Sequence, residues 1–192
     1  TAGHQCRVAE IAQQMAIILG LSKEKVEGIR FSAMIHDLGK IIVPGEILCK
    51  PGNLSSAEFE IIKSHPQAGH DILRKIEFPW PVAEIILQHH ERLDGSGYPR
   101  GLTADEILLE SKILAVADVV ETMSSHRPYR PSLGIKCALN EISGFKGKHY
   151  DPDAVEACIR IFEENKAPGV KAMNSSKTIS GIIGTHANRR II

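Results

Sequence analysis

The amino-acid sequence predicts an all-α fold, a bundle of about seven helices without a significant sheet. Apolar residues recur at the three- and four-residue spacing of an amphipathic helix along most of the chain. Convincing runs of alternating apolar and polar residues, which would indicate half-buried strands, are absent from the sequence. Ser or Thr followed three residues later by Glu, and prolines at helix starts, divide the apolar pattern into separate helices.

The first two predicted helices precede an irregular segment. Residues 8–19 carry one apolar stripe, and Gly20 follows this stripe as a stop signal. A second helix is predicted over residues 22–36, beginning at a serine, which is a common capping residue. The stretch IVPGEILCKPGNL, residues 42–54, contains two proline-glycine pairs and is predicted to be a loop.

Two proline signals organise the middle of the chain. Ser55 and Glu58 form a capping box that begins the next predicted helix. Pro66 interrupts this helix or restarts it, because a proline ring cannot follow a helical turn without losing a hydrogen bond. Pro81 suits the first turn of a further helix, which is predicted to end near His90.

The remaining helices follow the glycine-rich stretch DGSGYPRG, which is predicted to be a loop. Thr103 and Glu106 make a second capping box. A long helix is predicted over about residues 110–125 and another over about 132–143. The last helix begins at Asp151-Pro152, where a capping residue precedes a proline.

Length and charge favour one domain with a tail. The chain has 192 residues and a formal net charge of zero, so its overall charge does not indicate binding to DNA or RNA. We expect a domain over residues 1–165. Because residue 1 is Thr rather than Met, we also expect that this domain is part of a longer chain. Residues 166–192 carry basic residues and no acidic ones, and are predicted to be a poorly ordered tail.

The four cysteines and the hydropathy pattern favour the cytoplasm. The cysteines are scattered without a CxxC spacing, which argues against a disulfide framework and against a thiolate zinc site. No apolar run approaches the roughly 18–20 residues of a membrane-spanning helix, and no signal peptide is visible. We therefore expect a protein of a reducing compartment without membrane contact through this segment.

The stretch MIHDLGKII, residues 34–42, places His36 and Asp37 on an apolar helix. An ionised carboxylate in an apolar setting costs several kcal/mol unless it is paired or bound to a metal. Asp118 raises the same question within ILAVADVV. For each residue alone an ordinary interpretation remains open, since a lone histidine is most often hydrogen-bonded or at the surface, and an arginine would satisfy Asp118.

Polar residues of this kind recur at helix ends and on apolar faces. They are His4, His36, Asp37, His65, His89, His90 and Asp118. Nitrogen and oxygen ligands without sulfur suit divalent transition metals. A single ion that keeps a position free for water cannot use seven ligands, whereas two ions can if one carboxylate bridges them. Asp37 is the natural bridge, and two metals about 3.5–4 Å apart are an arrangement that cleaves phosphoesters.

The same residues carry a resemblance to a known family. The order His4, His36-Asp37 and Asp118 resembles the metal-binding signature of the HD superfamily of phosphohydrolases. The stretch HHERLDGSGYPRGL resembles the mark of its HD-GYP branch, and HDLGK, HPQAG, VAD and RPYRP match that branch as well. The resemblance runs from residue 4 to about residue 163.

The resemblance implies a helical bundle and a centre of two or three divalent metal ions that hydrolyses cyclic di-GMP to pGpG and often on to GMP. The family's ligands fall on the seven residues named above. Lys40 would meet the scissile phosphate or the leaving oxygen, and Tyr98 would pack near a guanine base. Arg127 and Arg130 would hold phosphate or base edges, for which the planar guanidinium is suited, although RPYRP alone would be a surface turn.

Departures from the family pattern leave alternatives open. Leu93 stands where Trp is common, Glu121 where Asp is usual, and His126 where Asp is usual. Hydrolysis of another cyclic dinucleotide and a non-catalytic module that senses cyclic di-GMP or docks a GGDEF-domain protein are the alternatives to cyclic di-GMP hydrolysis. Iron and manganese rank first among the metals, with zinc, nickel and cobalt also compatible, and a sensory or receiver domain is expected upstream.

Overall fold

The structure is a computed structural model that describes residues 2–125 and 132–164. These residues form nine α-helices and one 3-10 helix without a strand, so the predicted all-α class is confirmed. The elements in chain order are α1 (Ala2–Ile18), α2 (Lys23–Ile35), η1 (Leu38–Ile42), α3 (Gly45–Leu48), α4 (Ser56–Lys63), α5 (His65–Leu73), α6 (Val82–Gln88), α7 (Leu109–Ser124), α8 (Ile135–Gly144) and α9 (Pro152–Glu164). The predicted site residues Arg127 and Arg130, the departure His126 and the tail 166–192 lie outside the described residues.

The predicted helix starts are confirmed where a side chain caps the backbone. The hydroxyl of Ser22 accepts a hydrogen bond from the backbone N–H of Lys25 at the start of α2. Ser55 and Glu58 form both halves of the capping box at the start of α4. Pro66 lies in the first turn of α5, so it restarts the helix rather than kinking it.

Two sequence predictions differ from the structure. The second capping box begins no helix, because Thr103 pairs with Asp94 in an isolated β-bridge that keeps this part of the chain extended. The backbone N–H and the hydroxyl of Thr103 still donate to Glu106, at 2.8 and 2.7 Å, but they close a turn and α7 begins six residues after Thr103. The predicted loop 42–54 contains the short helix α3, which, with η1, brings the number of helices above the expected seven.

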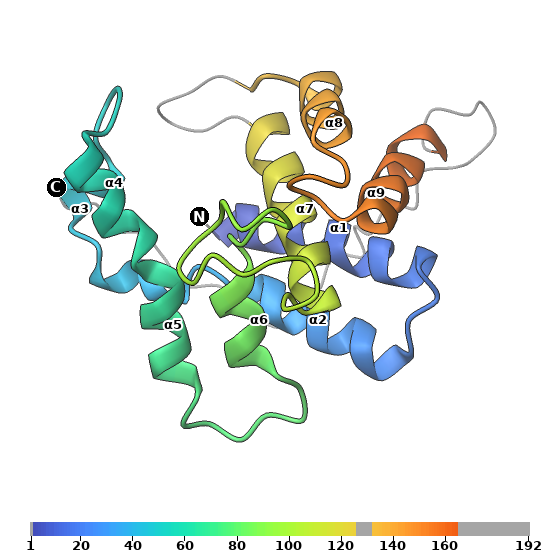
Figure 1. Cartoon of the computed structure of the whole chain (residues 1–192), viewed down its shortest axis with the longest axis horizontal. Coiled ribbons are helices and arrows are strands. Elements are labelled where there is room, and N and C mark those ends of the chain that lie inside the picture. Colours follow the sequence, from blue (N-terminus) through green and yellow to red (C-terminus); the bar gives the residue numbers. More distant parts are fainter. Residues whose placement is uncertain (1, 126–131, 165–192) are drawn as a thin grey trace, which may run out of the picture.

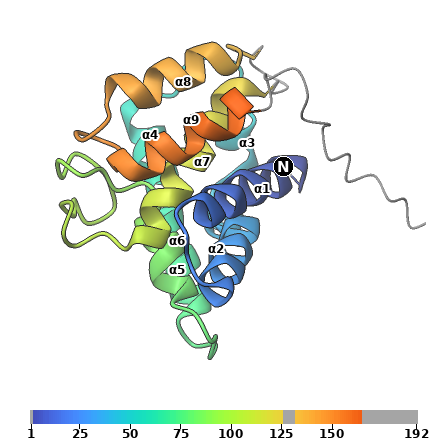
Figure 2. The same cartoon turned by 90° about the vertical axis from the view of Figure 1, so that its right-hand side faces the viewer.

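The main hydrophobic core surrounds α7. This helix contacts α1, α2, α6, α8 and α9, and it runs through the middle of the molecule (Figures 1 and 2). Ile113, Leu114, Val116 and Val120 of α7 are fully buried within this core. Burying apolar area at about 25 cal/mol per Å² is the main term that stabilises such a bundle. Asp118 therefore lies on a helix whose position is fixed from several sides.

A smaller core joins α5 and α6 to α2. Its buried residues are Leu73, Val82 and Ile86, and Phe31 and Trp80 pack against them. Helix α5 also contacts η1, the short helix that follows α2. The C-terminal ends of α2 and α6 are thereby brought to the N-terminal end of α5. No helix in the described part of the chain is long and apolar enough to span a membrane.

Candidate metal centre

The seven predicted ligands lie together at the meeting point of five helices. They are His4 in α1, His36 and Asp37 after α2, His65 at the start of α5, His89 and His90 after α6, and Asp118 in α7. They form three groups in which one ligand atom from each residue lies within 4.8 Å of the others: His4 with His36 and Asp118; His65 with His89 and His90; and His36 with Asp37 and His89. The third group links the first two.

Asp37 occupies the position between the two outer groups. Its Oδ1 atom lies 3.5 Å from Nε2 of His65. Its Oδ2 atom lies 3.5 Å from Nε2 of His36 and 4.0 Å from Nε2 of His4. One carboxylate therefore directs one oxygen toward each half of the cluster, as a bridging ligand does. His36 is 1% exposed, so the pair does not turn outward to solvent.

Among the described residues, Asp118 faces histidines rather than an arginine. Its Oδ1 atom lies 3.3 Å from Nε2 of His4 and 3.7 Å from Nε2 of His36. The hydroxyl of Thr122, one turn later, donates to the same oxygen at 3.3 Å. Asp118, which the sequence predicts as a ligand with a pairing arginine as the open alternative, thus lies in the histidine cluster.

Backbone carbonyls fix the orientation of three histidines. His36, His65 and His89 each donate from Nδ1 to the carbonyl three residues earlier, at 2.7, 2.7 and 2.5 Å. A neutral imidazole that donates from Nδ1 has its lone pair on Nε2. All three Nε2 lone pairs therefore point into the cluster, toward carboxylate oxygens and toward one another.

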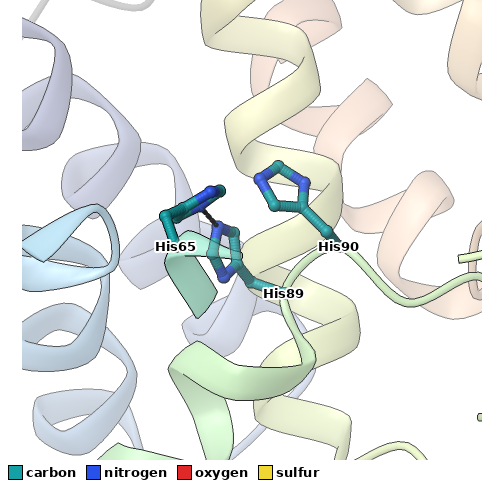
Figure 3. Close-up of side chains that lie close together, drawn as sticks. All are labelled: His65, His89 and His90. Carbon is teal, nitrogen blue, oxygen red and sulfur yellow. Dashed lines mark hydrogen bonds between the residues drawn. The ribbon is translucent and has the colours of Figure 1, made fainter. Parts of the chain in front are cut away.

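Such an arrangement of acceptors fits a bound cation. The rings of His65, His89 and His90 are turned toward one another in Figure 3, where Nε2 of His65 lies 3.4 Å from Nε2 of His89. Nε2 of His36 and Oδ1 of Asp37 are buried without a hydrogen-bond partner. Buried acceptors that face each other are costly unless a cation lies between them. The donor set therefore fits divalent metal ions.

Burial favours the neutral form of two histidines of the cluster, whereas the pKa of His4 moves the other way. Burial opposes this change, but the hydrogen bonds and charges of Asp118 and Glu121 raise the pKa of His4. Burial lowers the pKa of His89 to about 3 and holds the pKa of His90 well below its ordinary value. Burial alone would raise the pKa of Asp118, but the hydrogen bond from His4 and the charge of His36 hold it well below its usual range. Burial would likewise raise the pKa of Asp37, but the charges of His36 and Lys40 lower it below its ordinary value. Neutral histidines and ionised carboxylates are the metal-binding forms, so the shifts of His89, His90, Asp37 and Asp118 favour binding, and a protonated His4 would release its proton to bind an ion.

Glu121 orients His4 through the ring nitrogen that faces away from the cluster. Its side chain is 2% exposed, and its Oε2 atom accepts a hydrogen bond from Nδ1 of His4. Its Oε1 atom accepts hydrogen bonds from Nε of Arg7 at 2.6 Å and from the hydroxyl of Ser125 at 2.7 Å. From the sequence, Glu121 is noted only as a departure from the family pattern. Its position one turn after Asp118 is the signal that it lies beside the centre.

Lys40 and Tyr98 lie at the edge of the cluster. Nζ of Lys40 donates to Oδ2 of Asp37 at 2.6 Å, so the lysine is one turn from the aspartate, as the spacing predicts. The ring of Tyr98 stacks on that of His90, with centroids 4.8 Å apart and an angle of 27°. Burial raises the pKa of Tyr98, so its hydroxyl stays protonated at neutral pH.

The loop that carries Tyr98 is held by a buried carboxylate. Glu91 is 3% exposed, and its two oxygens accept hydrogen bonds from the backbone N–H groups of Arg100 at 2.7 Å and Leu102 at 3.0 Å. A Cβ atom on Gly97 would lie 2.4 Å from Cα of Glu91, so the loop folds closely over this residue. No role is predicted for Glu91 from the sequence. The position of an acidic residue directly after His89-His90 is the signal that could have indicated a role beside the centre.

The centre and the loop together combine groups whose chemistry suits a phosphodiester. The clustered imidazole and carboxylate groups suit divalent ions, a lysine lies beside them, and a tyrosine ring borders them. Ions of this kind neutralise phosphate charge and activate water. An aromatic ring at the border offers a face for a nucleobase.

Comparisons with known proteins place this site in a family. The family model for the HD domain matches residues 1–154. A cyclic di-GMP phosphodiesterase from Thermotoga maritima is 44% identical over 163 residues, which cover 84% of this chain and 44% of that protein. The 3'3'-cGAMP-specific phosphodiesterase 1 from Vibrio cholerae is 41% identical over 137 residues, which cover 71% of this chain and 32% of that protein. The chain thus spans less than half the length of either relative.

A solved structure has a fold similar to that of this chain. An HDG"Y"P protein from Bdellovibrio bacteriovorus superposes with a TM-score of 0.70 at 19% identity, covering 84% of this chain and 52% of that chain. Because the family model covers most of the chain and HHERLDGSGYPRGL lies beside the seven-residue cluster, the chain belongs to the HD domain family and is a member of its HD-GYP branch.

Proposed function

We propose that this domain is a metal-dependent phosphodiesterase that opens cyclic di-GMP to pGpG, and pGpG further to GMP. The observation that carries the proposal is the position of Asp37, whose two oxygens face the two outer groups of the cluster. A carboxylate in this position is what a pair of ions requires of its bridging ligand. The relative from Thermotoga maritima, which is named a cyclic di-GMP phosphodiesterase, supports the choice of substrate.

The proposed ligands divide into two sets that share Asp37. His4, His36 and Asp118 would hold one ion, and His65, His89 and His90 the other. We propose two ions, iron or manganese, because imidazole and carboxylate ligands suit both. Bound divalent ions supply a hydroxide nucleophile at neutral pH by lowering the pKa of water from about 15.7 toward about 7.

The remaining residues of the site bind and orient the substrate. Lys40 would exchange its hydrogen bond to Asp37 for one to the scissile phosphate or the leaving oxygen, where it stabilises developing negative charge. The ring of Tyr98 would lie against a guanine base. Arg127 and Arg130 would hold phosphate or base edges with their planar guanidinium groups.

Product analysis on protein purified without oxygen tests the proposal. We expect protein loaded with ferrous or manganous ions to convert cyclic di-GMP to pGpG and then to GMP, and Asp37→Ala to lose both the bound metal and the turnover. Glu10→Gln, at an exposed position of α1, is the control and should match the wild type. Full turnover by Asp37→Ala protein that contains no metal would overturn the proposal.

A hybrid cyclic dinucleotide is a second candidate substrate. The observation that favours it is the 41% identity to a Vibrio cholerae protein named a 3'3'-cGAMP-specific phosphodiesterase. Both compounds present the same phosphodiester to the metals and differ in one base. The values of kcat/KM for cyclic di-GMP and 3'3'-cGAMP, measured on one preparation, therefore decide between the two substrates.

A further inference from the structure

Helix α4 carries an aromatic ring and a cation beside the loop of Tyr98. Phe59 and Lys63 are four residues apart, so they lie on the same face of α4. Nζ of Lys63 lies 5.1 Å from the ring centroid of Phe59 and 5.8 Å from that of Tyr98. The Phe59 and Tyr98 rings meet edge to face, with centroids 6.4 Å apart.

These contacts connect α4 to the metal centre. Tyr98 stacks on His90 and also meets Phe59 edge to face, so Phe59 is two ring contacts away from a proposed metal ligand. Lys63 precedes His65, another proposed ligand, by two residues. In Figure 1, α4 and the start of α5 lie beside the loop that follows α6. The face of α4 therefore borders the same site as Tyr98, from a different part of the chain.

Packing does not account for an aromatic residue at position 59. The side chain of Phe59 is 43% exposed, and α4 has no buried residue. Neither of the two hydrophobic cores of the described residues includes Phe59. An exposed phenylalanine gains free energy only when something covers it, and this one lies next to a proposed nucleotide site.

The charge of Lys63 is also open to a new partner. Nζ of Lys63 donates to Glu60 at 2.7 Å, and Glu60 is 67% exposed. Ion pairs in such exposed positions contribute little to stability, so a ligand phosphate can replace Glu60 at small cost. A cyclic dinucleotide carries a second phosphate and a second base beyond those that meet the metals and Tyr98.

We propose that Phe59 and Lys63 form the outer wall of the substrate site, where the ring of Phe59 receives a purine base and Lys63 receives a phosphate of a cyclic dinucleotide. This inference rests on the proposed function, which it extends from the metal centre to α4. Stacking between a base and an aromatic ring is typically strong enough for its loss to raise KM about tenfold. The wall favours nucleotide diesters over diesters that have no base.

Two conservative variants test the wall. Phe59→Leu keeps an apolar side chain but removes the aromatic face, and Lys63→Gln keeps a similar length but removes the charge. For each variant we expect KM for cyclic di-GMP to rise about tenfold, with kcat changed less than about twofold. The ratio of KM for cyclic di-GMP to KM for methyl p-nitrophenyl phosphate, a diester without nucleobases, should also rise about tenfold.

An exposed apolar residue and an exposed lysine away from Tyr98 provide the controls. Ile61→Ala changes another exposed apolar residue of α4, which is 41% exposed, and Lys23→Gln changes a lysine that is 92% exposed on α2. Both controls should keep the wild-type KM. Circular dichroism and metal content, measured on every variant, establish that each has the helical fold and the loaded centre.

The outcomes separate this inference from the proposed function. If Phe59→Leu and Lys63→Gln keep the wild-type KM for cyclic di-GMP, the assignment of Phe59 and Lys63 to the substrate site is overturned, and the phosphodiesterase proposal stands. An equal loss toward both diesters also overturns the wall, because it would point to damage at the metal centre. If the wild type itself leaves cyclic di-GMP intact, the proposed function is overturned and the wall with it.

Discussion

Four histidines of the metal centre donate a hydrogen bond from Nδ1, the ring nitrogen that faces away from the cluster. Backbone carbonyls accept from His36, His65 and His89, whereas a carboxylate, Glu121, accepts from His4. A partner on the outer nitrogen fixes the tautomer and the ring orientation and raises the basicity of the inner nitrogen. A carbonyl acts on one ring only, but Glu121 also joins His4 to Arg7, and therefore couples the metal centre to the surface of α1.

Glu121→Gln should weaken metal binding while leaving the seven proposed ligands in place. The neutral amide loses the charge that holds His4, and its NH2 group cannot accept from Arg7. We expect metal affinity to fall about 10- to 100-fold, the usual effect of removing such a partner, measured by competition with a chelator. Glu10→Gln is the control. An unchanged metal affinity in Glu121→Gln would show that Glu121 does not position His4.

Local signals explain which elements were predictable. The capping box at Ser55 and Glu58 was predicted and confirmed, because both halves of the motif act within one turn. The similar pair at Thr103 and Glu106 was predicted as a helix start and forms a turn instead, because Thr103 also pairs with Asp94. A signal within one turn cannot report a competing partner from elsewhere in the chain.

The short helix η1 places Asp37 and Lys40 through a close approach to α5. A Cβ atom on Gly39 would lie 1.9 Å from the carbonyl oxygen of His65 and 2.6 Å from the backbone nitrogen of Gly69. Only a glycine lets the two backbones come this near. The sequence showed the glycine of HDLGK, but it did not show which helix approaches it.

Gly39→Ala should push η1 away from α5 and damage the centre. We expect the free energy of unfolding to fall by about 1–3 kcal/mol, the usual cost of overpacking, measured by urea denaturation, and we expect metal binding to weaken because Asp37 moves from His65. Gly45→Ala is the matched control, since a Cβ atom there meets nothing within 4 Å. If Gly39→Ala is as stable as Gly45→Ala and binds metal equally well, the close approach does not position Asp37.

At the scale of the whole molecule, the centre takes its ligands from helices of both hydrophobic cores. The larger core fixes α1 and α7, and the smaller core joins α2, α5 and α6. His36, His65 and His89 are at most 1% exposed, so the fold buries polar groups among these helices. Groups buried in this way cost free energy, which metal coordination offsets.

Metal removal should therefore destabilise the whole domain. Ions at about 1,000 times their Kd stabilise the folded state by about 4 kcal/mol. We expect the Tm of metal-loaded protein to fall on treatment with a chelator, and to recover when manganous ions are added back. Asp37→Ala should show no shift of this size. Equal Tm values with and without metal in the wild type would contradict a stabilising centre.

The sequence alone determined the helical class, most helix starts and the seven residues that the structure brings together. These depend on apolar spacing, on caps within one turn and on the chemistry of residue types, all of which act locally. Only the tertiary structure decided that Asp37 lies between the two outer groups, that Glu121 holds His4, and that Phe59 borders Tyr98. Each of these contacts joins different elements, and their packing sets which side chains meet.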